Sequence, residues 1–131
     1  MALDLPPASL ALVATGGAVG AALRVAAGTA VMSTWPGIAA WPVATFGVNV
    51  LGSFLLGALA GWSARGGAGG WHLFLGTGLL GGFTTFSTFS LELVELLERG
   101  DMLHAVAHAG LSLAGGVGAL WLALTISRGW A

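Results

Sequence analysis

Residues 76–90 read Gly-Thr-Gly-Leu-Leu-Gly-Gly-Phe-Thr-Thr-Phe-Ser-Thr-Phe-Ser, a stretch that carries four glycines and six hydroxyl residues inside an apolar run long enough to cross a membrane. A glycine inside a helix costs about 1 kcal/mol relative to alanine, so Gly81-Gly82 followed by Thr84-Thr85 predicts a break in this helix. Because hydrocarbon offers the released N–H and C=O groups no partner, such a break must be buried in protein or line a polar cavity. The alternative is a continuous glycine-rich helix that packs closely on its neighbours.

The composition is typical of a helical membrane protein. Of the 131 residues, 56% are hydrophobic and 7% are charged, and the formal net charge is −1. With only four Arg and no Lys, the chain has no surface for nucleic acid or another polyanionic partner. The absence of cysteine excludes disulfides and thiolate metal sites. The N-terminus lacks the basic region of a signal peptide, so the first apolar segment is expected to stay in the mature protein.

Four apolar segments are each about as long as a helix that crosses a membrane. They run approximately over residues 10–32, 41–63, 71–97 and 102–126, with turn-forming residues between them. We therefore predict an all-α membrane protein in which residues 1–131 form a single four-helix domain and the third helix is broken near its middle. A soluble helical core is the alternative, but these segments leave almost no polar face. Tryptophans that suit a membrane–water interface lie at or near the segment ends: Trp35, Trp41, Trp62, Trp71 and Trp130.

The arginines are divided evenly between the two sides of the expected membrane domain. Four spans place both termini and the loop at residues 64–70 on one side, with Arg65 and Arg128. The opposite side holds Arg99 and, by proximity, Arg24. The positive-inside rule then gives almost no preferred orientation. Either other features set the orientation, or the chain inserts in both senses and pairs antiparallel with itself.

Among the polar residues inside the expected spans, Asn49, Arg24 and Glu92 are candidates for a functional role. We favour a pathway role for Asn49 over a purely structural one, because polar groups inside a membrane tend to mark pathways. Arg24 either extends along its span to the interface, which we favour, or lies in a vestibule that attracts anions. Glu92 follows Phe89 by three positions and therefore shares its helix face, as a gating or pairing carboxylate or as an interfacial group.

The sequence offers no catalytic constellation. His104 and His108 have the spacing of a helical metal face, but no third ligand of matching depth accompanies them, so hydrogen-bonding or vestibule roles are favoured. The GxSxG, HExxH and P-loop patterns are absent. We therefore do not expect an enzyme.

The segment that follows the expected break combines aromatic and hydroxyl side chains. Phe86 and Phe89 fall on one helix face, and the positive edges of their rings suit a small anion, to which hydroxyl groups and the Asn49 amide would donate hydrogen bonds. Carbonyl oxygens exposed by the break would suit a desolvated cation such as Na⁺. The alternative is that both phenylalanines simply pack against a neighbouring helix.

The sequence of residues 81–90, with Glu92 just after it, resembles the third-helix signature of the Fluc-type fluoride channels, the CrcB family. Residues 45–54 (Thr-Phe-Gly-Val-Asn-Val-Leu-Gly-Ser-Phe) are similar to the second-helix motif of that family, and residues 16–24 (Gly-Gly-Ala-Val-Gly-Ala-Ala-Leu-Arg) to its first. The match covers the first three spans in the correct order. Phe83 stands where family members usually have leucine, a difference that leaves backbone coordination untouched.

The resemblance implies an antiparallel, dual-topology homodimer in the bacterial plasma (inner) membrane, which exports fluoride passively through two pores. It implies that Phe86 and Phe89 form an aromatic box, that Asn49 is the pore amide, and that Ser87 and Thr88 belong to a hydroxyl track. Ser112 is assigned to this track by its position alone.

The resemblance also implies a structural Na⁺ at the dimer interface, held by the backbone carbonyls of Gly81 and Thr84 from both subunits. Arg24 corresponds to the arginine of the family's first helix, and Glu92 to the glutamate of its third.

Two rival functions remain open. One is a small proton-coupled exporter of the dual-topology four-helix type, for which Glu92 is the sole candidate carboxylate. The other is a packing subunit of a larger complex.

Overall fold

The computed structural model describes residues 6–38, 41–67 and 70–129, which are mostly helical and include no strand. Trp130 lies outside the described residues. The four expected apolar segments correspond to three long helices and one segmented span. In chain order, the elements are α1 (Pro7–Thr34), the short 3₁₀ turn η1 (Pro36–Ile38), α2 (Val43–Ala64), η2 (Leu73–Leu80), α3 (Gly81–Phe83), α4 (Phe86–Glu98) and α5 (Met102–Gly129).

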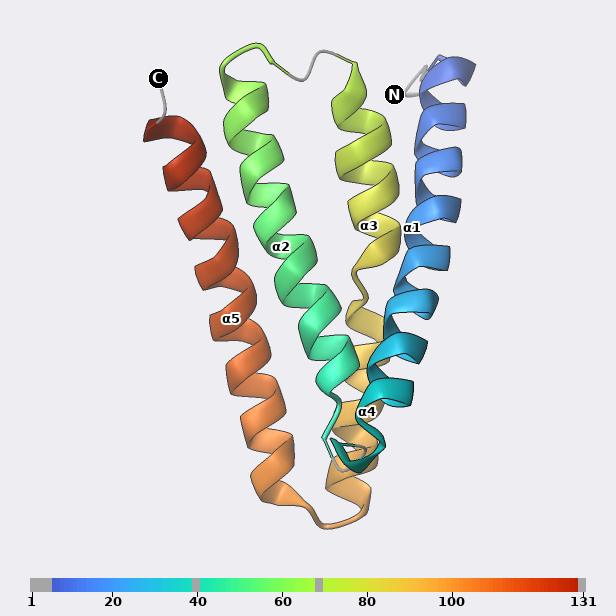
Figure 1. Cartoon of the computed structure of the whole chain (residues 1–131), viewed down its shortest axis with the longest axis vertical. Coiled ribbons are helices and arrows are strands. Elements are labelled where there is room, and N and C mark those ends of the chain that lie inside the picture. The colour runs from blue at the N-terminus through green and yellow to red at the C-terminus, as the bar shows by residue number, and fades with distance from the viewer. Residues whose placement is uncertain (1–5, 39–40, 68–69, 130–131) are drawn as a thin grey trace, which may run out of the picture.

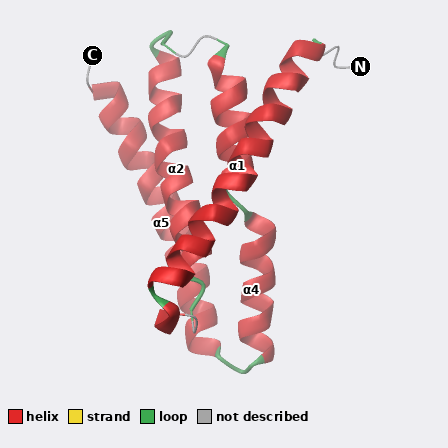
Figure 2. Cartoon of the chain, turned by 45° about the vertical axis from the view of Figure 1, so that its right-hand side comes forward, coloured by secondary structure: helices red, strands yellow, loops and turns green. Residues whose placement is uncertain are grey.

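The third span is built from three pieces. It begins with η2, a π-helix that leads directly into the single turn α3. Thr84 and Thr85 then take extended backbone conformations, with φ/ψ of −82°/157° and −149°/117°, before α4 begins. Figure 2 shows α4 separated from the first half of the span by this short loop. The predicted break near the middle of the third helix is therefore confirmed, and a π-helical stretch that the sequence did not predict precedes it.

The chain runs from one end of the helical bundle to the other four times. In Figure 1 both ends of the chain lie at the same end of the bundle as the connection from α2 to η2, whereas the connections from α1 to α2 and from α4 to α5 lie at the other. Three helices (α1, α2 and α5) are each long and apolar enough to cross a membrane. The third span reaches a comparable length only through η2, α3 and α4 together. The chain is a multi-pass helical membrane protein.

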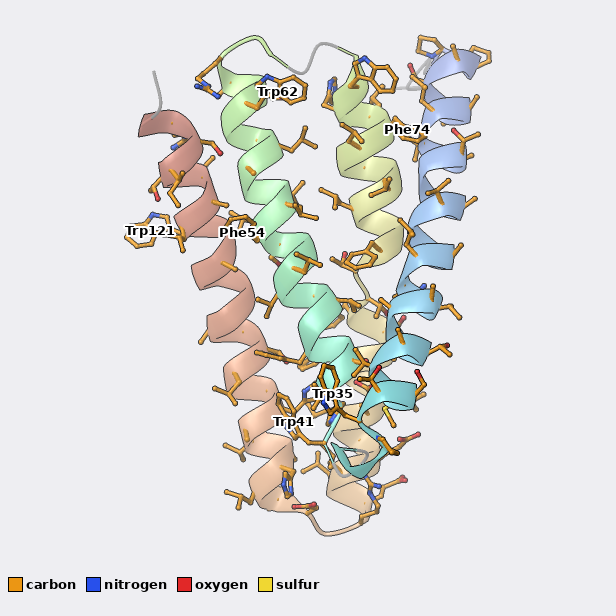
Figure 3. The ribbon with its side chains drawn as sticks, viewed as in Figure 1. Trp35, Trp41, Phe54, Trp62, Phe74 and Trp121 are labelled. Carbon is orange, nitrogen blue, oxygen red and sulfur yellow. The ribbon has the colours of Figure 1, made fainter. Side chains whose placement is uncertain are left out.

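Labelled tryptophans lie near both ends of the bundle. Figure 3 places Trp35 and Trp41 toward one end and Trp62 at the other, as the sequence predicted for interfacial aromatics. Trp121 differs, because it projects outward from the C-terminal third of α5, about two turns before the helix ends. It is 68% exposed, which places it on a surface that faces lipid or another chain.

Glycines allow two close helix contacts. In α1, a Cβ atom on Gly20 would overlap the carbonyl oxygen of Leu79 in η2. In α2, a Cβ atom on Gly57 would overlap the carbonyl oxygen of Leu120 in α5. These small residues let the backbones approach closely, which drives helix association where both lipid and protein are apolar.

Replacing Gly20 with alanine should destabilise the fold, whereas the same change at Gly28 should not. The added methyl group at Gly20 meets backbone, which cannot rotate away, and overpacking of this kind costs about 1–3 kcal/mol. A Cβ atom on Gly28 has nothing within 4 Å in the described structure, so Gly28→Ala controls for helix propensity. Thermal unfolding in detergent should show a lower Tm for Gly20→Ala alone. Equal Tm values for the two variants would mean that α1 does not pack on η2 through Gly20.

The turn between α4 and α5 is held by Asp101. Gly100 occupies the left-handed region with φ +73°, and the Asp101 carboxylate accepts a hydrogen bond from the backbone N–H of His104 at 3.3 Å. The imidazole Nδ1 of His104 lies 2.8 Å from both carboxylate oxygens. The hydrogen bond from His104 holds the pKa of Asp101 below its ordinary value of 3.8.

Asp101→Ala should lower stability slightly, by removing a helix-capping group and the partner of His104. Because the folded-state pKa is depressed, the contribution of Asp101 is fully present above its ordinary value of 3.8 and is lost as pH falls through the lower folded value. Thermal unfolding of both proteins near neutral pH and in acid measures this. A difference that persists below the folded pKa would show that the carboxylate charge is irrelevant.

Candidate functional site

A side chain from the neighbouring helix forms hydrogen bonds with the backbone at the break. Asn49, on α2, donates from Nδ2 to the carbonyl oxygen of Thr85 at 3.0 Å, and its Oδ1 accepts from the backbone N–H of Thr85 at 2.7 Å. One amide thus satisfies both backbone groups of an extended residue, which in lipid would otherwise have no partner. Asn49 therefore has a structural role that the sequence interpretation had placed second. Its amide nitrogen carries a second N–H, which remains for a ligand.

The hydroxyl of Thr85 caps α4. Its Oγ1 accepts from the backbone N–H of Thr88 at 3.1 Å and donates to the Thr88 hydroxyl at 3.0 Å. Ser87 Oγ lies 3.4 Å from the same oxygen. Ser87 and Thr88 therefore surround the start of α4.

These bonds redirect the N–H groups that would otherwise serve the carbonyls before the break. In a continuous helix Thr85 N–H would donate to Gly81 and Thr88 N–H to Thr84. Both donate instead to side chains, of Asn49 and Thr85 respectively. The carbonyl oxygens of Gly81 and Thr84 thereby lose their usual helical donors. Neutral, oxygen-only groups of this kind suit a hard cation such as Na⁺, so the residues present fit the group that the sequence led us to expect.

Arg24 also reaches the break. Its Nε donates to the carbonyl oxygen of Gly82 at 3.2 Å, across the contact between α1 and α3. We had favoured an extension toward the membrane interface, which the structure does not support. Gly82 packs against α1, where a Cβ atom would overlap the carbonyl oxygen of Gly17. Arg24 thus satisfies one of the carbonyls that the break releases.

A cavity of about 330 Å³ opens beside the break, between α2, α5 and the third span. Six of the residues singled out from the sequence line it: Asn49, Gly81, Thr84, Phe86, Phe89 and Ser112. Ser87 and Thr88 are not among its lining residues. Thr85 and Ser53 also line it, although the sequence interpretation did not assign either of them to the pore. Ser53 follows Asn49 by four positions, and this spacing was the available signal.

Two phenylalanines form the wall of the cavity on α4. The ring centroids of Phe86 and Phe89 lie 5.5 Å apart with their planes tilted by 40°. Phe86 is 79% exposed, so only part of its ring is covered within the chain. Both rings line the cavity, and the positive edge of an aromatic ring suits an anion.

A second polar cluster consists of Glu92, Thr45 and His108, and it lies next to the cavity because His108 contacts Phe89. The carboxylate oxygen Oε1 accepts from the hydroxyl of Thr45 at 2.6 Å, and Oε2 lies 3.4 Å from Nε2 of His108. His108 is fully buried, and its ring centroid lies 4.8 Å from that of Phe89. The two histidines that the sequence paired by spacing thus have separate partners, His104 in the turn and His108 in the bundle.

The fold and the site define a class of protein. The bundle of apolar helices contains one interrupted helix, and released carbonyls, an amide from α2, hydroxyls and aromatic rings lie at the interruption, beside a cavity. In a membrane, irregular backbone is tolerated where it is buried in protein or lines a cavity, and broken helices of this kind form ion and substrate sites. The class is that of multi-pass membrane proteins with a broken helix beside a cavity.

Comparison with known proteins gives the family. Residues 11–124 match the family described as CrcB-like protein, Camphor Resistance (CrcB). A protein of Novosphingobium aromaticivorans named "Fluoride-specific ion channel FluC" is 49% identical over 120 residues, which cover 91% of this chain and 95% of that protein. Proteins of the same name from Hyphomonas neptunium and Phenylobacterium zucineum are each 47% identical, over 89% and 92% of this chain and 93% and 95% of theirs. The chain belongs to the CrcB family, as its motifs predicted.

Proposed function

We propose that this protein is a fluoride-selective channel that lets cytoplasmic fluoride leave passively across the bacterial plasma membrane. The observation that carries the proposal is the cavity at the break, where the Asn49 amide lies beside Phe86 and Phe89. The names of the relatives support the same ion. HF crosses the membrane as a neutral acid and ionises at cytoplasmic pH, so a passive path for the anion is enough to export it.

The cavity suits weak, rapid binding of a small anion. The remaining N–H of Asn49 and the hydroxyl of Ser112 are hydrogen-bond donors, and the phenyl edges add a favourable field. None of the described residues that line the cavity is charged. Conduction requires an ion to leave as readily as it enters, and a fixed cation in the wall would hold the anion too tightly.

The proposal includes an antiparallel homodimer with two pores. Phe86 lines the cavity and is nevertheless 79% exposed, so a second copy is needed to complete the wall on that side. With Arg24 held at the break, the ends of the bundle carry Arg65 and Arg128 against Arg99, which is still too small a difference to fix one orientation. Insertion in both senses would supply antiparallel partners.

A Na⁺ ion at the dimer interface is part of the same proposal. The carbonyls of Gly81 and Thr84 would hold it, two from each subunit, because their helical N–H donors are used elsewhere. When bound, the ion would neutralise the partial negative charge of four carbonyl oxygens brought together between the chains.

A proton-coupled exporter is the second candidate, and the pairing of Glu92 with His108 is the observation that favours it. Such a transporter needs a carboxylate inside the membrane that exchanges a proton for its substrate. The candidates differ in coupling, since a channel conducts fluoride under a voltage alone.

An efflux assay tests the proposed function. Purified protein is reconstituted into liposomes loaded with potassium fluoride and potassium chloride, and valinomycin starts the efflux, which fluoride and chloride electrodes follow. The proposal predicts rapid loss of fluoride and retention of chloride, compared with protein-free liposomes. Equal loss of both anions would contradict selectivity. Loss of neither would favour a packing subunit that conducts nothing alone.

A further inference from the structure

His108 is a buried histidine placed between the cavity and a carboxylate. Its Nδ1 lies 3.4 Å from the hydroxyl oxygen of Ser112, which lines the cavity, and its Nε2 lies 3.4 Å from Oε2 of Glu92. In the part of the chain that the structure describes, neither Nε2 nor this carboxylate oxygen has a hydrogen-bond partner. Leaving two buried polar atoms unsatisfied is unfavourable, and a proton between them would satisfy both.

From this geometry we propose that His108 couples the protonation of Glu92 to the direction of the Ser112 hydroxyl, and so sets whether Ser112 donates a hydrogen bond into the cavity. His108 is a positioning residue in this account, because it acts on the anion only through Ser112. The coupling itself does not depend on the proposed function, but its expected effect, a change in fluoride conduction, does.

With one proton on the pair, His108 is neutral and Glu92 is ionised. The proton lies on Nε2, because an unprotonated Nε2 would point its lone pair at the carboxylate. Nδ1 is then an acceptor, since a neutral imidazole has one N–H and one lone pair. The Ser112 hydroxyl donates to Nδ1, and its only hydrogen is withdrawn from the cavity.

A second proton reverses this arrangement. One proton then lies between Oε2 of Glu92 and Nε2, and the other lies on Nδ1, whether the pair is written as neutral acid and imidazole or as carboxylate and imidazolium. Nδ1–H donates to Ser112 Oγ, so the serine hydrogen is free to donate to an anion in the cavity. One proton is taken up from water and forms the Nδ1–H bond; in the neutral-acid form, the Nε2–H bond is exchanged for an O–H bond on Glu92.

The surroundings of His108 leave Glu92 as its titrating partner. Helix α2 packs on α5 and contains no ionisable residue; its Thr45 donates to the other oxygen of Glu92. Helix α4 contributes Glu92, with Glu95 one turn further on and Glu98 at its end. The other titratable group near the start of α5 is His104, which is paired with Asp101 in the turn.

The first test measures the fluoride current of reconstituted wild-type protein as a function of pH. Neutral HF carries no charge, so it does not contribute to the current. The inference predicts that the current rises about tenfold as the pH falls from about 8 to about 4, the effect of adding one donor to an anion over a range that spans the ordinary pKa values of histidine and glutamate. A current that does not change with pH would overturn it.

Two variants separate the pair from other titrating groups. In Glu92→Gln, the amide oxygen takes the bond from Thr45 and the amide N–H donates to Nε2 at every pH. This variant should conduct at the acidic wild-type level with no pH dependence. His104→Gln is the matched control and should keep the wild-type response. Persistence of the response in Glu92→Gln, or its loss in His104→Gln, would contradict the assignment to His108 and Glu92.

A spectroscopic measurement tests the coupling without transport. Nitrogen NMR of ¹⁵N-histidine-labelled protein in lipid distinguishes the two tautomers of a histidine, and the chain has three histidines. The His108 signal should show an Nε2–H tautomer at high pH and gain a proton on Nδ1 on acidification, and Glu92→Gln should hold Nδ1–H throughout. A tautomer that does not change would overturn the inference. A tautomer change in a protein that conducts no fluoride would overturn the proposed function and leave the coupling intact.

Discussion

Asn49→Asp should abolish fluoride conduction. The carboxylate keeps the acceptor for the Thr85 N–H but loses the donor to the Thr85 carbonyl, and it has no N–H left for the anion. It also places a negative charge on the cavity wall. Two unit charges about 4 Å apart repel by about 4 kcal/mol at an effective dielectric constant near 20, so the flux should fall by at least about a hundredfold.

The comparison with Asn49→Ala separates charge from packing. Alanine removes both bonds to Thr85 and should lower the Tm, because two backbone groups at the break lose their partner. Aspartate should keep more of the stability and lose more of the flux. Fluoride efflux and thermal unfolding of the same preparations measure both quantities. Fluoride efflux at the wild-type rate from Asn49→Asp would show that the Asn49 amide is not part of the anion path.

The second large effect is expected at Phe86. Isoleucine keeps an apolar side chain of moderate size but has no ring edge, so Phe86→Ile should reduce fluoride flux to near the level of protein-free liposomes while the protein still folds. The ring lines the cavity and contacts Phe89 at a centroid distance of 5.5 Å. A dehydrated anion in the cavity is attracted electrostatically by the positive edge of the phenyl ring, and isoleucine cannot supply this attraction.

Phe54→Ile is the matched control for this substitution. Phe54 lies on α2 and is not among the residues that line the cavity; Figure 3 shows it on the side of α2 that faces α5. Fluoride efflux from Phe54→Ile should remain close to that of the wild type. Equal loss of flux in both variants would mean that any lost phenylalanine disturbs the bundle, and the proposed aromatic wall would lose its support.

Local sequence chemistry indicated the break, and the resemblance of residues 81–90 to the family's third-helix signature favoured it over a continuous glycine-rich helix. Gly81-Gly82 and Thr84-Thr85 have low helix propensity, which is a local property that can be recognised without knowledge of neighbouring helices. The contacts that close the break were not predictable in the same way. Spacing shows which residues share a helix face, but the rotation of α2 against the third span decides that Asn49 meets Thr85, and that rotation is set by packing across the whole interface.

The break also limits what spacing predicts beyond it. Helical periodicity relates residues three and four apart only while the backbone stays helical. The extended residues Thr84 and Thr85 reset that phase, so Phe86 and Phe89 reach the cavity whereas Ser87 and Thr88 surround the cap of α4. The pairing of Glu92 with His108 was missed for a related reason, since it joins two helices whose relative rotation the sequence does not give.

The reversal potential of the wild-type current is the most direct test of the central claim, that fluoride passes through this protein by a conductive path. Purified protein in a planar bilayer is given a fluoride gradient, equal chloride on both sides and a separately varied pH gradient. We predict a reversal potential that shifts by about 59 mV for each tenfold change in the fluoride gradient and does not follow the pH gradient. A reversal potential that follows the proton gradient, or that ignores the fluoride gradient, would contradict the account.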